Sequence, residues 1–177
     1  MNFKIYLCYP EKLNTAPKDP SYSPQKHEVT WEMCKVMNKT NEIEFYIDGI
    51  SYEERMTGLS LSIDWDLAVL LEQLPDVLRK ISDNDYNFRI DFYEQGSEFF
   101  LQFSSDESEI VDVTYNSYSG NVTCSTSVKK SELSAMFKKI YKDFIFLSKT
   151  ICGYLYEFND ASINTLLSVE ELGIIDK

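Results

Sequence analysis

The stretch that decides the fold runs from Asn87 to Val128 and reads NFRIDFYEQGSEFFLQFSSDESEIVDVTYNSYSGNVTCSTSV. Apolar and polar residues alternate in four runs, at 88–93, 98–103, 111–115 and 122–126. Alternation with a period of two is typical of a strand with one buried face. The runs are separated by short segments of serine, glycine, aspartate and asparagine, which favour turns. The sequence therefore predicts an antiparallel meander with one apolar face and one polar face.

Helical spacing appears on both sides of this meander. A stripe of six apolar residues predicts a helix at about 65–82, in which Pro75 causes a kink or begins a second short helix. A second stripe continues through seven turns of 130–158 and predicts a long amphipathic helix that covers the apolar face of the meander. A last helix is expected over 160–172, ended by Gly173.

The N-terminal part adds further strands. Alternation predicts strands at 3–8, 27–37, 42–48 and 59–63, with a turn at Asp48 and Gly49. Four prolines between residues 9 and 26 predict a surface loop. The expected class is α+β: a single domain over residues 1–177 in which helices cover an antiparallel sheet.

Composition limits the partners. The chain has 177 residues and a formal net charge of −12, so nucleic acid phosphates and anionic membrane surfaces should repel it, while a basic protein should be attracted. No stretch is long and apolar enough to span a membrane, and no signal peptide is evident. The four cysteines form no CxxC pair; we expect free thiols in a cytoplasmic protein, with two disulfides in a secreted protein as the alternative.

The negative charge is concentrated on the meander. Residues 83–112 hold nine acidic residues and a single basic one, Arg89. Strand parity places several of these acids on the polar face together with two large aromatic residues, a mixture that is typical of protein interfaces. We therefore predict that this face binds a partner; the alternative is that another element of the chain covers it. The predicted partner-binding residues are Asp91, Tyr93, Glu98, Phe100 and Asp112.

One segment matches a metal-binding pattern in part. Residues 83–94 resemble an EF-hand calcium loop, with Asp83, Asp85, Asn87, Asp91 and Glu94 as the oxygen ligands. However, Phe88 occupies the position where the loop needs glycine, and the residues that follow alternate like a strand. The competing interpretation is a polar turn between a helix and a strand.

Other candidate chemistry is sparse. Asp64 and Asp66 have the spacing of a carboxylate pair that could hold a divalent metal in an enzyme, but a helix cap is the simpler explanation. His27 is the single histidine, and it has no cysteine partners at the spacing of a zinc site. The chain has no glycine-rich phosphate loop and no nucleophile motif, so we expect no cofactor and no catalytic residues.

The acidic meander and the long helix that opens at Ser131, Glu132 and Leu133 resemble the immunity proteins of bacterial polymorphic toxin systems. The resemblance is one of architecture and charge over about half of the chain, and it carries no diagnostic motif. It implies a non-catalytic protein that binds a cognate toxin, often a basic nuclease, and blocks it in the cytoplasm. Acidic residues would then mimic phosphates and speed the encounter.

Overall fold

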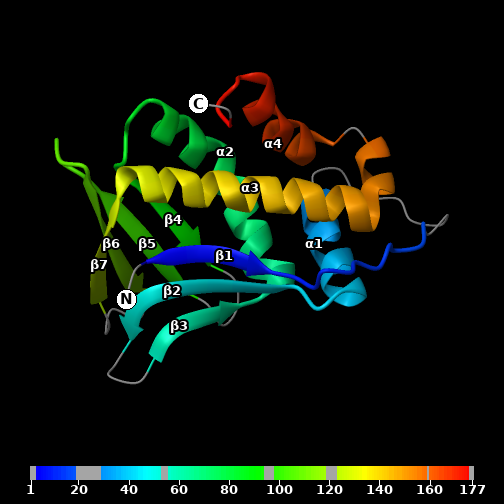
Figure 1. Ribbon diagram of the computed structural model, residues 1–177, viewed down its shortest axis with the longest axis horizontal. Coiled ribbons are helices and arrows are strands. Elements are labelled where there is room, and N and C mark those ends of the chain that lie inside the picture. The colour runs from blue at the N-terminus through cyan, green and yellow to red at the C-terminus, as the bar shows by residue number, and fades with distance from the viewer. Residues whose placement is uncertain are drawn as a thin grey trace.

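The computed structural model describes residues 3–18, 29–52, 56–93, 98–118, 123–158 and 160–175. It confirms the α+β class: two antiparallel sheets are packed with helices (Figure 1). The first sheet has the strand order β1-β2-β3 and the second has the order β4-β5-β6-β7. The strands are β1 (Lys4–Cys8), β2 (Glu44–Tyr52), β3 (Met56–Leu61), β4 (Phe88–Phe92), β5 (Phe99–Ser104), β6 (Ile110–Ser117) and β7 (Thr123–Lys129).

The four-stranded sheet is the predicted meander, and its register follows the alternation in the sequence. Ile90 pairs with Leu101, which pairs in turn with Tyr115, and all three side chains are buried. On the opposite face, Arg89 pairs with Gln102, and Gln102 pairs with Thr114. Because side chains on a strand alternate between faces, this register gathers the apolar residues on one side of the sheet.

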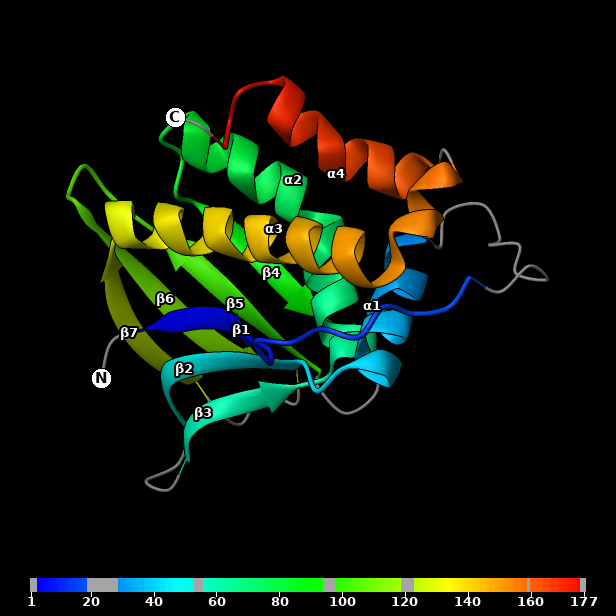
Figure 2. The same cartoon turned by 45° about the vertical axis from the view of Figure 1, so that its right-hand side comes forward.

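The long helix α3 (Lys130–Cys152) crosses in front of the strands in Figure 2 and covers the apolar face. The Phe137 ring contacts Phe88 and Phe103 at centroid distances of 6.1 and 5.9 Å, and Phe3 beside β1 reaches Phe103 at 6.0 Å. These rings join the helix, the meander and the N-terminal segment in one core. The predicted helix over 130–158 is therefore confirmed through Cys152, after which the chain continues as a 3-10 helix (Gly153–Glu157).

Two further helices complete the layer beside α3. A π-helical turn (Ile63–Leu67) leads into α2 (Ala68–Ser82), which continues through Pro75 without ending. The C-terminal α4 (Ala161–Glu171) packs on α2, with Asp160 as its N-cap, and Gly173 follows it with a φ of 65°. The helices that we predicted at 65–82 and 160–172 are thus both present.

The segment at 27–37 does not form the predicted strand. From Val29 onward it belongs to a helix, α1 (Val29–Thr40), while 27 and 28 lie outside the described residues. Val29, Met33 and Met37 are fully buried, at a spacing of four residues, whereas Trp31 is only partly buried. The strand prediction was wrong because Val29, Met33 and Met37 lie four residues apart, a spacing that fits both a strand face and a helix face.

The expected turn at Asp48 and Gly49 also takes another form. Strand β2 continues to Tyr52, and the register with β3 shifts between Asp48 and Tyr52. Gly49 has a φ of 81°, a conformation that favours glycine. The glycine therefore forms an irregularity within the strand rather than its end.

The N-terminal segment lies along α3. Residues 9–18 form no helix or strand, but the Ala16 amide donates to the Ile151 carbonyl at 2.8 Å, and Ala16 is buried. Before it, the Ile5 amide contacts the Met136 sulfur at 2.9 Å. Among the described residues, no helix is long and apolar enough to cross a membrane.

Candidate protein-binding surface

The polar face of the meander is open to solvent. Its members come from β4, β5, β6 and β7 at alternating positions, and each is exposed or half-buried in the structure. We call this surface the outer sheet face; it consists of Arg89, Asp91, Phe100, Gln102, Asp112, Thr114, Asn116, Ser125 and Ser127. The polar face that parity predicts is therefore present and is not buried under other described elements.

Arg89 is the centre of the contacts on this face. Its guanidinium carbon lies 3.8 Å from the centre of the Phe100 ring and 5.5 Å from that of Tyr118. The same guanidinium forms an ion pair with Asp91, and the Asp91 carboxylate also accepts a hydrogen bond from the Tyr118 hydroxyl. This hydrogen bond raises the pKa of Tyr118 above its usual range. The four side chains form one ordered cluster of charge and aromatic surface.

Four of the five predicted partner-binding residues divide between the two ends of the sheet. Asp91 and Phe100 are directly paired in the register, so the structure brings them together. Glu98 lies at the same end of the sheet and is exposed. Asp112 lies four residues before Asn116, the register partner of Phe100, and is therefore about 13 Å farther along the strand. Its carboxylate accepts a hydrogen bond from Ser127 at 2.8 Å.

Tyr93 connects the sheet to the helices. Its ring is 53% exposed, and its hydroxyl donates to the Glu72 carboxylate of α2 at 3.1 Å. The other oxygen of Glu72 accepts from the indole nitrogen of Trp31 in α1. Trp31 packs edge-on against Trp65 at a centroid distance of 5.4 Å, and Trp65 is 48% exposed. Exposed aromatic residues thus continue from the edge of the meander onto α1 and the π-helical turn.

Sequence reasoning missed Tyr118, Glu72, Trp31 and Trp65. Tyr118 falls in the turn that follows β6, where alternation does not predict to which face of the sheet a side chain points. The other three come from elements distant in the chain, and strand parity cannot detect that they meet at Tyr93. The aromatic character of Trp31 and Trp65 was the only signal that the sequence offered for them.

The residues of the partial calcium loop have other partners. Asp85 accepts from the Asn87 amide at 2.9 Å and pairs with Lys80 at 3.2 Å, and these contacts lower the pKa of Asp85. Asp83 follows the last residue of α2 and Asn84 has a φ of 58°, so the chain turns here and enters β4 rather than a second helix. Glu94 lies outside the described residues. Within the described ranges, no three His, Cys, Asp or Glu side chains gather as metal ligands.

The two acidic residues before α2 are not equivalent. The Asp66 carboxylate accepts from the Ser62 amide at 2.8 Å, which satisfies a donor at the start of the helical segment. Asp64 has one buried oxygen with no hydrogen-bond partner in the described parts of the chain. Neither aspartate is the N-cap, which is Ser62, so the simple cap interpretation was wrong; Asp66 instead reaches back from within the π-helical turn to the Ser62 amide.

The two buried cysteines have pKa shifts opposite to those of an activated thiol. All four are free thiols, and Cys34 and Cys152 are fully buried. Burial raises the pKa of Cys34 well above its usual value and that of Cys152 to about 12. A nucleophilic thiol needs the opposite shift, because the thiolate is the reactive form.

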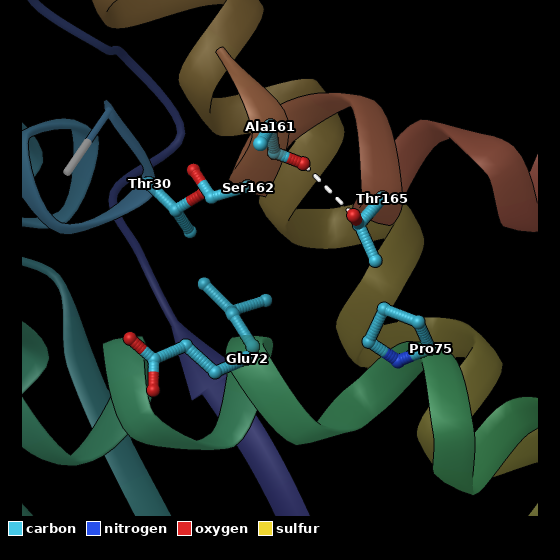
Figure 3. A pocket seen from close by; sticks show the side chains of 7 residues that line it. Thr30, Glu72, Pro75, Ala161, Ser162 and Thr165 are labelled. Carbon is cyan, nitrogen blue, oxygen red and sulfur yellow. Dashed lines mark hydrogen bonds between the residues drawn. The ribbon is translucent and has the colours of Figure 1, made fainter. Parts of the chain in front are cut away.

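A pocket of about 270 Å³ lies between α1, α2 and α4 (Figure 3). It borders the Tyr93 contact, since Glu72 lines it. The remaining lining residues are Thr30, Leu71, Pro75, Ala161, Ser162 and Thr165.

Comparison with known proteins gives no relative. No protein-family model, no curated protein and no solved structure matches the chain.

Proposed function

We propose that this chain is a non-catalytic protein that binds a basic protein partner through the outer sheet face. The observation that carries the proposal is the ordered cluster of Arg89, Phe100, Asp91 and Tyr118. Large aromatic and arginine side chains held in fixed positions at the surface are the residues that most often dominate binding energy at interfaces. Their order in the absence of a partner lowers the entropy lost on binding.

The charge of the molecule supports a basic partner. The formal net charge is −12; Asp112 lies at one end of the outer sheet face, and the exposed Glu98 lies just beyond the other end. Complementary charge accelerates association and disfavours acidic competitors, including nucleic acid. Asp91 contributes less free charge than its position suggests, because Arg89 already pairs with it.

The specific form of the proposal is an immunity protein that neutralises a cognate bacterial toxin in the cytoplasm. Acidic composition and a sheet face that is free to dock both agree with an inhibitor that acts by binding. Genome neighbourhood tests this form directly. A large toxin gene immediately upstream supports it, and a metabolic operon contradicts it.

A binding experiment tests the surface. With the product of that neighbouring gene as the partner, the double variant Glu98→Lys and Asp112→Lys should lose most of its affinity, and the loss should depend on salt. The matched control is Asp76→Lys with Glu171→Lys, which makes the same change in net charge at exposed positions of α2 and α4. Equal loss in both double variants would show that only net charge matters and that the wrong face was chosen.

A further inference from the structure

We propose that the pocket between α1, α2 and α4 binds an alkyl cation, that is, an ammonium or guanidinium group on a short apolar stem. This inference does not depend on what binds the outer sheet face, because it concerns a different surface. Figure 3 shows the arrangement: Glu72 and Pro75 of α2 lie on one side, and Thr30, Ser162 and Thr165 lie on the other.

The hydroxyl groups that line the pocket already donate hydrogen bonds within the protein. Thr30 donates to the Ser162 hydroxyl at 2.9 Å, and Ser162 donates to the Asp160 carboxylate at 2.5 Å. Thr165 donates to the Ala161 carbonyl at 2.8 Å. Each of these hydroxyl oxygens can still accept a hydrogen bond, but none of the hydroxyls can donate another one. The hydroxyls therefore favour a ligand that donates.

Pro75 removes one backbone donor from the helix beside the pocket. A proline inside a helix has no N–H, so the Leu71 carbonyl one turn earlier loses its regular helical donor. Leu71 and Pro75 both line the pocket. Their side chains also supply an apolar wall, against which the stem of an alkyl cation can pack.

Glu72 supplies the charge. The Trp31 indole and the Tyr93 hydroxyl each donate to one of its two oxygens, which fixes the carboxylate in place. A carboxylate can accept about four hydrogen bonds, so two of its positions stay open for a ligand. In the described parts of the chain, Glu72 forms no ion pair with a lysine or arginine. A ligand cation would thus be its ionic partner.

The N-terminus of α4 also faces the pocket, and a helix N-terminus ordinarily favours anions. Here the buried Asp160 carboxylate already occupies that position, since it accepts from the Ser162 amide at 2.8 Å. Together with Glu72, it makes the surroundings unfavourable for a second negative charge. The size of the pocket, about 270 Å³, suits one side chain or a small amine rather than a drug-sized molecule.

The test is a titration of the 177-residue chain, monitored by the NMR signals of the backbone amides of Thr30, Ser162 and Thr165. Butylguanidine should move these signals in a saturable way, while inorganic phosphate should not. Glu72→Gln, which keeps an acceptor for the Trp31 indole, should weaken butylguanidine binding at least tenfold. The control Asp76→Asn removes the same charge from an exposed position one turn away on α2 and should change affinity less than threefold.

Three outcomes would overturn the proposal: no saturable shift at the pocket with butylguanidine, equal weakening in Glu72→Gln and Asp76→Asn, or tighter binding of phosphate. A steric variant, Ala161→Leu, should abolish the shifts without a loss of net charge. A further probe, N-acetylarginine methylamide, distinguishes the two sources of such a cation, a protein side chain and a free small molecule. Binding as tight as that of butylguanidine indicates an arginine side chain of a protein, and weaker binding indicates a free small molecule.

Discussion

The side-chain amide of Gln73 pairs with the backbone of Asp91 in both directions. Its nitrogen donates to the Asp91 carbonyl and its oxygen accepts from the Asp91 amide, each at 2.9 Å. Asp91 belongs to β4, the edge strand of the meander. A single residue of α2 thereby substitutes for a neighbouring strand at the position opposite Phe100.

Replacement of Gln73 by methionine keeps its length but removes both hydrogen bonds. We expect the free energy of unfolding to fall by about 1–3 kcal/mol, because two backbone groups of the edge strand lose their partner. Urea denaturation followed by circular dichroism measures the change. Asp76→Asn, at an exposed position of the same helix, should cost less than about 1 kcal/mol. A Gln73→Met variant as stable as Asp76→Asn would show that the pairing contributes nothing.

Phe137 should be among the most costly residues of α3 to truncate. It is fully buried between Phe88 and Phe103, so Phe137→Ala leaves a cavity and should lower the free energy of unfolding by about 3–5 kcal/mol. Phe146, on the same helix, is 53% exposed, and Phe146→Ala should cost less than about 1 kcal/mol. Thermal or urea melting of the two variants gives the comparison, and similar losses would contradict the packing described above.

Two glycines near the C-terminus provide a matched pair. An added Cβ meets nothing within 4 Å at either Gly153 or Gly173, so contacts do not distinguish them. Gly173 has a φ of 65°, and Gly173→Ala should destabilise the protein by about 1–2 kcal/mol. Gly153 has a helical φ of −53°, and Gly153→Ala should stabilise it by about 0.4–1 kcal/mol. Chemical denaturation measures the free energy of unfolding of both variants. A change of the same sign in Gly173→Ala and Gly153→Ala would refute this assignment of backbone conformation.

Stability should fall in alkaline solution. Burial raises the pKa of Cys152 from 9.0 and that of Tyr156 from 10.0 to about 12 in the folded protein. In the unfolded chain both groups ionise at their ordinary pKa, so the unfolded state binds fewer protons and gains stability from pH 9 up to about 12. The free energy of unfolding should therefore decrease across this window, by at most about 1.4 kcal/mol per pH unit for each group.

Tyr156→Phe checks this assignment. The variant loses the hydrogen bond to Ser148 and should be less stable at neutral pH by about 0.5–1.5 kcal/mol. Between pH 10 and 12 its stability should decline less steeply than that of the wild type, as measured by urea titrations at several pH values. Parallel curves for the two proteins would assign the alkaline loss to other groups.

How far the sequence predicts this structure depends on whether a pattern stays within one element. Alternation in β4 to β6 identified the strands and placed Asp91 and Phe100 on the same polar face, because parity is a property of the strand itself. The same logic failed at 29–37, where the spacing of Val29, Met33 and Met37 fits both periods. The meeting of Glu72, Tyr93 and Trp31 depends on how three elements pack, and no local pattern encodes it. The pocket depends in addition on the directions of hydrogen bonds, which only three-dimensional contacts define.

The position of the N-terminal segment has a consequence for synthesis on the ribosome. The Ile5 amide meets Met136, and Ala16 meets Ile151, so this segment contacts the part of the chain that is translated more than 100 residues later. Until α3 has emerged, Phe3, Ile5 and Leu7 have no helix to shelter them. Contacts of such long sequence separation slow folding and leave apolar strands exposed to aggregation. The apolar side chains of this segment should therefore stay exposed on the nascent chain until residues 130–152 have been translated.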